Sequence, residues 1–144
     1  YDSGIIFANF CPKSKFIVTT SYATVMIWDI ETGKQVGETM KHNGYVYSVH
    51  FNPEGNLLVT TSNDNCAKIW DVKTGKQVGE TIEHENYVNF AQFSPDGKFV
   101  VSVSRDLTVK ITEFPPLQNL IEKYSKKFNS TPLTEKELIE YNFK

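Results

Sequence analysis

The sequence has few of the residues that define several common protein classes. It contains two cysteines, Cys11 and Cys66, among 144 residues, which is too few for a disulfide scaffold or a four-cysteine zinc site. Its apolar runs are short, so no membrane partner is expected. The formal net charge is −2, which argues against a surface that binds nucleic acid through bulk positive charge.

Motifs for catalysis and for metal binding are also missing. The sequence has no Walker loop, no glycine-rich phosphate cradle, no His-x-x-x-His and no Cys-x-x-Cys. We therefore expect a protein that is not an enzyme, with no catalytic residues, no cofactor and no metal. The chain starts at Tyr1 without a charged-then-apolar leader, so we expect it to be processed or a fragment, and cytoplasmic.

What the sequence does have is an internal repeat. The run TGKQVGET occurs at 32–39 and again at 74–81, a shift of 42 residues that also carries His42 onto His84. A further copy lies upstream at a shift of 41, where the run FCP matches FNP. A fixed period of this length indicates a repeat architecture. The predicted units are 1–40, 41–82 and 83–114.

Each unit contains four segments with the composition of short strands. In the middle copy, runs rich in β-branched and aromatic residues alternate with turn-forming residues. The predicted strands of that copy are 45–51, 57–61, 66–70 and 76–82. Four short strands in 42 residues, with a Trp-Asp dipeptide at the end of the third, are typical of one blade of a β-propeller.

At these positions the chain resembles the WD-repeat β-propellers. The residues that carry the resemblance in the middle copy are His42, Val46, Phe51, Pro53, Gly55, Ser62, Asp64, Ile69, Trp70 and Asp71. Those of the third copy are His84, Val88, Phe93, Pro95, Asp96, Gly97, Ser104 and Asp106. The resemblance implies an all-β fold, a partial WD-repeat propeller of three four-stranded blades over 1–114.

The pattern departs from the family at three places. Tyr22 stands where the turn aspartate belongs in the first copy, and Thr112 stands at the tryptophan position of the third. Pro115 and Pro116 follow the third strand of the last copy, and proline cannot donate to a strand ladder. We therefore expect the last blade to lack its outer strand.

The resemblance also implies a structural hydrogen-bond network inside each blade. Its expected members are His42, Ser62, Asp64 and Trp70 in the middle copy, and His84, Ser104 and Asp106 in the third. The same residue types could form a catalytic triad of serine, histidine and aspartate. Their recurrence at the repeat interval favours the structural interpretation.

Function is expected to be non-catalytic, as a protein–protein interaction or scaffold module. Loops at one end of a rigid propeller commonly carry binding residues. Counting from the repeated His and Asp, the candidates for contact with a protein or peptide are Asn43, Tyr45, Asn63, Glu85, Tyr87 and Arg105. The alternatives are a sensor or recruitment domain of a multidomain signalling enzyme, and a structural cap that only completes a ring.

Residues 115–144 differ from the repeats. Apolar residues at helical spacing predict a helix over 117–128, and a capping box at Thr134 predicts a second, short one to about Tyr141. This helical tail resembles the ending of bacterial WD-repeat signalling proteins, and it is expected either to cover the propeller or to dock a partner.

Three blades are too few to close a ring. We therefore expect further blades of the same protein as partners, and no stable monomer of residues 1–144 alone.

Overall fold

The computed structural model describes residues 4–13 and 15–114. Their strands, in chain order, are β1 (Phe7–Phe10), β2 (Phe16–Thr20), β3 (Thr24–Asp29), β4 (Gln35–Lys41), β5 (Val46–Phe51), β6 (Leu57–Ser62), β7 (Cys66–Asp71), β8 (Ile82–Glu83), β9 (Val88–Phe93), β10 (Phe99–Ser104) and β11 (Val109–Glu113). The helical tail expected over 117–141 lies outside the described residues.

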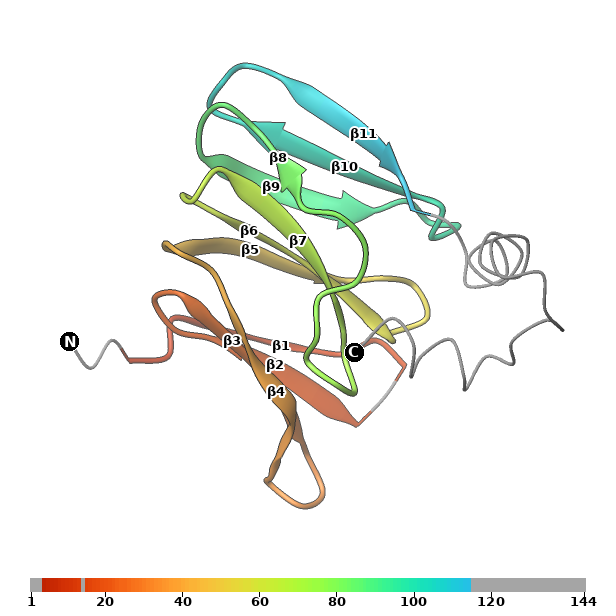
Figure 1. Cartoon of the computed structure of the whole chain (residues 1–144). Coiled ribbons are helices and arrows are strands. Elements are labelled where there is room, and N and C mark those ends of the chain that lie inside the picture. Colours follow the sequence, from red (N-terminus) through yellow and green to blue (C-terminus); the bar gives the residue numbers. More distant parts are fainter. Residues whose placement is uncertain (1–3, 14, 115–144) are drawn as a thin grey trace, which may run out of the picture.

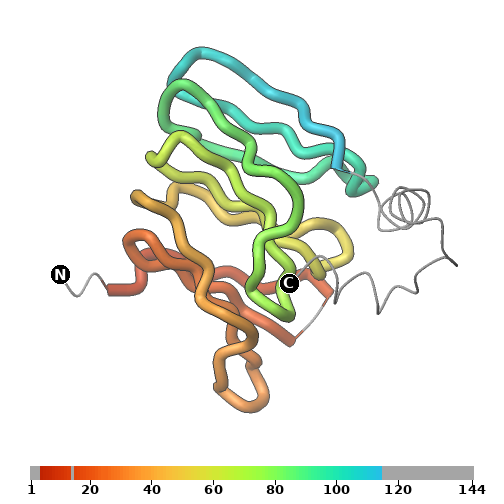
Figure 2. The backbone as a smooth tube through the Cα atoms, viewed as in Figure 1, coloured from red at the N-terminus to blue at the C-terminus, as the bar shows by residue number. Residues whose placement is uncertain are grey.

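The strands form three antiparallel sheets, each made from consecutive strands. The first sheet has the order β1-β2-β3-β4, the second β5-β6-β7-β8 and the third β9-β10-β11. Figure 1 shows the three sheets side by side as successive blades, and Figure 2 traces the same path of the backbone. This arrangement confirms the expected all-β fold of a partial propeller, and the third sheet has no fourth strand among the described residues.

Strand register repeats from sheet to sheet. Ile17 pairs with Trp28 in the first sheet, and Leu58 pairs with Trp70 in the second. In the third sheet, Thr112 takes the place of tryptophan in this pairing. The structural repeat thus follows the sequence repeat residue by residue, because the same alternation of apolar residues sets the register of each pair of strands.

The fourth strand of the second sheet is shorter than the expected 76–82. Only Ile82–Glu83 forms β8, with an isolated bridge between Trp70 and Gln77 before it. Gly79 lies between these two pairings with φ of 72°, a left-handed conformation that interrupts an extended ladder. In the first sheet Gly37 has a similar φ of 68°, but β4 continues through it as an irregularity in the pairing with β3.

The core lies between the sheets, because the facing surfaces of neighbouring sheets bury one another. β6 is buried on both faces: Leu58 packs toward the first sheet and Val59 toward the third, and each is 0% exposed. The cluster between the first and second sheets consists of Val18, Val25, Ile27, Met40, Val46, Val49, Leu58, Trp70 and Val72. The cluster between the second and third consists of Val59, Ala67, Ile69, Ile82, Val88, Ala91, Phe93, Val100 and Phe114.

The two outer faces of the stack carry exposed apolar side chains. On the third sheet Ile111 is 73% exposed, whereas Ile69, its repeat equivalent in the second sheet, is 2% exposed. Just before β1 of the first sheet, Ile5 is 65% exposed, whereas its equivalent Val46 is 5% exposed. The outer faces therefore have the same chemistry as the faces that pack together within the stack.

Two glycines bring the backbones of neighbouring sheets into direct contact. The N–H of Glu38 in β4 donates to the Thr74 carbonyl in the turn after β7, at 2.8 Å. A Cβ atom on Gly75 would overlap the Glu38 backbone, and one on Gly37 would lie 2.5 Å from the Thr74 carbonyl carbon. Only glycine permits this close approach.

We predict that Gly75→Ala destabilises the protein by about 2–4 kcal/mol, since the added methyl group must displace rigid backbone and the residue keeps a positive φ. Gly33→Ala is the matched control, because Gly33 occupies the equivalent turn with φ of 65° and has nothing within 4 Å of its Cβ position. It is expected to cost only about 1 kcal/mol. Urea denaturation measures both, and equal losses would contradict the inter-sheet contact.

Candidate functional site

A row of aromatic side chains crosses all three sheets at one end of the stack. The ring centroids of Tyr22 and Tyr45 are 5.7 Å apart, and those of Tyr45 and Tyr47 are 5.6 Å apart. The Tyr47 and Tyr87 centroids follow at 6.3 Å, and the guanidinium carbon of Arg105 lies 5.4 Å from the Tyr87 centroid. We call these five residues the tyrosine row.

The tyrosine row is assembled from loops and from one strand. Tyr22 lies in the turn between β2 and β3, Arg105 in the equivalent turn between β10 and β11, and Tyr45 and Tyr87 immediately precede β5 and β9. Tyr47 projects from β5 itself. Tyr22, Tyr47 and Tyr87 are 52%, 38% and 37% exposed, so the row presents aromatic surface to solvent.

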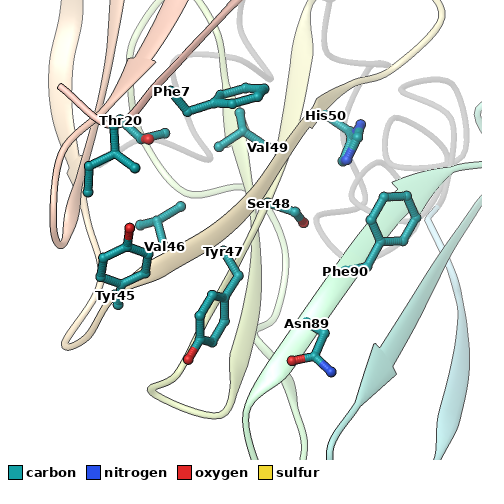
Figure 3. Close-up of a pocket in the computed structure, with 11 residues that line it drawn as sticks. Phe7, Thr20, Tyr45, Val46, Tyr47, Ser48, Val49, His50, Asn89 and Phe90 are labelled. Carbon is teal, nitrogen blue, oxygen red and sulfur yellow. The ribbon is translucent and has the colours of Figure 1, made fainter.

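A pocket adjoins this row along the inner strands β1, β5 and β9. Its volume is about 380 Å³, and its lining residues are Ile6, Phe7, Thr20, Tyr45, Val46, Tyr47, Ser48, Val49, His50, Asn89 and Phe90. Figure 3 shows Tyr45, Tyr47 and Asn89 near one end of the pocket and Phe7, His50 and Phe90 near the other. The first end joins the tyrosine row.

The structure places the other predicted contact residues beside the row, where they organise its loops. The carboxylate of Asp64 accepts a hydrogen bond from the backbone N–H of Asn43, and that of Asp106 accepts one from Glu85. Asn63 Oδ1 accepts a hydrogen bond from the Tyr45 N–H at 2.6 Å. These bonds fix the backbone that carries the tyrosines.

Sequence reasoning missed Tyr47 and the pocket. The signal was available, because Tyr45 and Tyr47 are two residues apart and side chains at that spacing lie on the same side of a strand. The predicted contact residues after His42 were confined to the loop, Asn43 and Tyr45, and did not include residues of the following strand. The equivalent residue in the third sheet is Asn89, so the repeat itself does not point to an aromatic residue there.

A buried polar network lies behind the loops of the second sheet. His42 Nδ1 is 2.8 Å from Asp64 Oδ2, and His42 Nε2 is 2.7 Å from Thr60 Oγ1. The Trp70 indole N–H donates to the same Thr60 oxygen at 2.8 Å. Since the carboxylate only accepts hydrogen bonds, Nδ1 of His42 donates to it and Nε2 accepts from the Thr60 hydroxyl.

The structure differs from the sequence-based expectation at Ser62. The hydroxyl that links His42 to Trp70 belongs to Thr60, two residues earlier on the same face of β6. Ser62 Oγ instead accepts a hydrogen bond from the Asp64 N–H at 3.1 Å, so it holds the turn rather than the histidine. In the ladder Thr60 pairs with Lys68, diagonally across from Trp70 on the same face, whereas Ser62 lies at the end of β6.

The third sheet repeats this arrangement without the indole. His84 Nδ1 is 3.0 Å from Asp106 Oδ2, and His84 Nε2 is 2.9 Å from the hydroxyl of Ser102, the equivalent of Thr60. Ser104, which was expected in this role, accepts a hydrogen bond from the Asp106 N–H. The first sheet retains the tryptophan part of this network, since the Trp28 indole N–H donates to the Thr19 hydroxyl at 2.8 Å.

Burial and hydrogen bonding set the charges in these networks. Burial lowers the pKa of His42, so the ring is neutral near pH 7. Burial alone would raise the pKa of Asp64, but hydrogen bonds from the Asn43 N–H and from His42 outweigh it and lower that pKa. The hydroxyl of Thr108 is the main cause of the lowered pKa of Asp106.

Two segments of the chain match the family model described as WD domain, G-beta repeat, at residues 33–71 and 75–112. Together the matches cover more than half of the sequence. The chain belongs to the WD-repeat family. Repeats of this family indicate a protein–protein interaction module, and such domains are generally non-catalytic.

One curated relative of this WD-repeat chain is a protein of Danio rerio named "Apoptotic protease-activating factor 1", with 38% identity over 63 residues. That match spans 43% of this chain and 5% of the length of the relative. Among solved structures, the chain is similar to the crystal structure of the computationally designed Ika4 protein. The TM-score is 0.69 and the identity 27%, over 80% of this chain and 69% of that one.

The order of Asp64, His42 and Thr60 is that of a carboxylate, an imidazole and a hydroxyl in a catalytic triad. In this WD-repeat sheet, however, Thr60 is 0% exposed and its oxygen already accepts the Trp70 indole N–H. A substrate cannot reach a hydroxyl that is enclosed in this way. The geometry therefore indicates a structural network, which stiffens the sheet because its buried polar groups satisfy one another.

Within residues 4–13 and 15–114, no group of three or more His, Cys, Asp or Glu side chains is placed to hold a metal ion. The same part of the chain contains no helix that is long and apolar enough to cross a membrane. Cys11 and Cys66 are free thiols.

We predict that Thr60→Val destabilises the protein by about 2–4 kcal/mol, because it leaves the Trp70 indole N–H and the His42 ring nitrogen buried without a partner. Ser62→Ala removes only a turn hydrogen bond and is expected to cost about 1 kcal/mol. Urea denaturation of both variants measures the difference. A larger loss for Ser62→Ala would contradict the assignment of Thr60 as the linking hydroxyl.

We also predict that the free energy of unfolding falls as the pH is lowered from 7 to 3. The pKa of His42 in the folded state lies below its ordinary 6.5, so the unfolded chain binds more protons below that pH. The lowered pKa of Asp64 adds a further loss as the pH falls through 3.8. Denaturation at several pH values tests both effects.

In that pH series, His42→Asn is expected to flatten the change in stability between pH 7 and 5. His50→Gln is the matched comparison, since burial lowers the pKa of His50 too, although His50 is only half-buried on the pocket wall. An unchanged slope in His42→Asn would show that the buried ring is not the group responsible.

Proposed function

We propose that this WD-repeat chain is a non-catalytic interaction module and that the tyrosine row is its partner-binding surface. One observation carries the proposal: five side chains from three sheets form one unbroken series of ring and guanidinium contacts. Tyrosine and arginine are enriched at the energetic centres of protein interfaces, and surface held by packing loses little entropy on binding.

Asn43, Asn63 and Glu85 form the border of the proposed surface. Their hydrogen bonds support the loops, and Asn43 and Glu85 are exposed beside the row. A polar border around an aromatic centre is the usual composition of a transient interface. We propose that these residues contact the rim of a protein or peptide partner and that the aromatic residues provide most of the affinity.

We further propose that the module serves a larger signalling protein, either as a scaffold or as the part that senses and recruits. The match to a WD-repeat segment of a protein named for activating a protease in apoptosis supports this role. We propose the cytoplasm as its location, a compartment in which free thiols such as those of Cys11 and Cys66 persist. The sequence of the complete gene is the direct test, because it would show whether an ATPase, kinase or protease-like module accompanies the repeats.

The two outer sheet faces support a second type of partner, namely further blades of the same protein. Ile111 and Val109 on the third sheet occupy the positions of Ile69 and Ala67, which are buried against a following sheet. Repeat arrays gain much of their stability from such contacts between neighbouring units. We propose that each outer face packs against another blade.

The partner-binding surface can be tested by affinity capture with the full-length protein, followed by mass spectrometry. We predict that proteins retained by the wild type bind at least tenfold more weakly to Tyr87→Ala and Arg105→Ala, as expected for central interface residues. Tyr87→Phe keeps the ring and should retain most of the binding. Lys98→Ala, at the opposite end of the third sheet, is the control for Arg105. Unchanged capture by both alanine variants would refute the assignment of the surface.

Packing of the outer face can be tested in the same protein. We predict that Ile111→Asp destabilises full-length protein by about 3–5 kcal/mol, because a carboxylate would be buried without a partner between blades. Leu107→Asp is the control, since Leu107 lies in a turn and is 95% exposed. It should change stability by less than about 0.5 kcal/mol. A similarly small effect of Ile111→Asp would mean that the face stays in solvent.

A further inference from the structure

The side chain of Arg105 is held in a fixed orientation at the mouth of the pocket. Its guanidinium carbon lies 5.4 Å from the Tyr87 ring centroid and 5.8 Å from the Tyr47 centroid. Its Nε–H donates to Asn89 Oδ1 at 3.2 Å. Contacts with two rings and one hydrogen bond restrict a side chain that would otherwise sample many rotamers on a surface.

Most of the hydrogen-bonding capacity of Arg105 is unused. A guanidinium has five N–H donors, and the Nε–H contact with Asn89 uses one of them. The remaining donors have no hydrogen-bond partner among residues 4–13 and 15–114, and Arg105 forms no ion pair within that part of the chain. They are available in the fork geometry that matches a carboxylate.

The acidic residues beside Arg105 in this sheet, Asp106 and Glu85, form no ion pair with it among the described residues. Asp106, the next residue, accepts hydrogen bonds from Thr108, from the Glu85 N–H and from His84. Glu85 is exposed in the loop before β9 and forms no ion pair with a residue that the structure describes. Neither carboxylate therefore occupies the guanidinium donors of Arg105, which stay free for a ligand.

The pocket behind Arg105 carries no charge of its own. None of its eleven lining residues is Asp, Glu, Lys or Arg, and aromatic and aliphatic side chains form most of its wall. Tyr47 and Asn89 belong both to the wall and to the support of Arg105, so the charged and the uncharged parts form one continuous site. A volume of about 380 Å³ lies within the range of pockets that hold small organic groups.

From this juxtaposition we propose that the site binds a peptide segment in which an acidic side chain lies next to a large apolar side chain. The carboxylate would bind the free N–H groups of Arg105, and the apolar side chain would enter the pocket beside Tyr47. This inference rests on the proposed function and specifies the chemistry of the partner. The free guanidinium donors of Arg105 select the acid, and the uncharged, largely apolar wall selects its neighbour.

A single-stranded nucleic acid is the other ligand for which a row of aromatic rings is suited, since bases stack on tyrosine. Such ligands also require a groove of positive charge that follows the phosphates. The tyrosine row contains one cation, and the whole chain has a formal net charge of −2. The observations therefore favour the peptide, and the nucleic acid serves as a competing outcome of the test.

The first experiment is selection of a random heptapeptide phage library on the full-length protein. Parallel selections use Arg105→Gln and, as a control with the same loss of charge at the opposite end of the sheet, Lys98→Gln. We expect wild type and Lys98→Gln to enrich peptides with Asp or Glu within two residues of Phe, Tyr, Trp or Leu. Arg105→Gln is expected to lose that enrichment.

The second experiment titrates one enriched peptide, and its form with the acid replaced by the amide, by fluorescence polarisation. The amide form should bind wild type about tenfold more weakly, as expected for loss of one charge-assisted pair. The same replacement should have no effect on Arg105→Gln. Arg105→Lys should also bind weakly, since lysine lacks the planar fork, whereas Tyr47→Phe should bind nearly as the wild type does.

Several results would overturn the inference. They are enrichment of basic peptides, equal enrichment on Arg105→Gln, no enrichment at all, or tighter binding of a twelve-residue oligothymidylate than of any peptide. The proposed function fails separately, when captured proteins are retained by both Tyr87→Ala and Arg105→Ala. A protein partner lost in those variants together with a basic peptide motif would leave the interaction module intact and refute only the acidic ligand.

Discussion

The structure depends on the burial of β6 between two sheets. Successive residues of this strand point to opposite sides, so Leu58 fills the space toward the first sheet and Val59 fills the space toward the third. A strand that is apolar on both faces has no stable position at the surface of a single sheet. Stacking of the repeats is therefore the condition for each sheet to exist, which is why the units are found as an array.

Polar groups within this apolar stack are tolerated because they bond to one another. The indole of Trp70 contributes its ring to the cluster with the first sheet and its N–H to Thr60, so one side chain belongs to both the core and the network. The network ends at Asp64, whose carboxylate also holds the loop before β5. The position of the tyrosine row thus follows from interactions that begin in the core, since the buried network fixes the loops that carry it.

Much of this architecture could be predicted from the sequence, because the repeat and the Trp-Asp dipeptide specify period, strand order and register together. The identity of the linking hydroxyl could not. Thr60 and Ser62 lie on the same face of β6, and only the register with Trp70 shows which of them meets the histidine. The length of β8 was not predictable either, since residues 35–39 of the repeated run belong to β4 whereas the equivalent residues 77–81 lie outside β8.

Only part of the candidate surface could be predicted from the sequence, because the repeat identifies some of its residues and not others. Tyr45, Tyr87 and Arg105 could be found by counting from repeated residues, whereas Tyr47 lies at the irregularity in the pairing of β5 with β6 and contacts Tyr87 and Arg105 of the third sheet. A repeat pattern identifies positions that recur. It does not identify a residue such as Tyr47, whose equivalent in the next copy is asparagine and whose role depends on two different copies meeting.

The contact between Glu38 and Thr74 joins the last strand of one sheet to a turn of the next, and the two partners are different parts of the repeat. The same holds for the sheet faces, since the face with Leu58 meets a preceding unit and the face with Val59 a following one. The stack therefore has a direction. Any assembly that extends it must bring the face of the Val59 type in one unit against the face of the Leu58 type in the next, so units add head to tail.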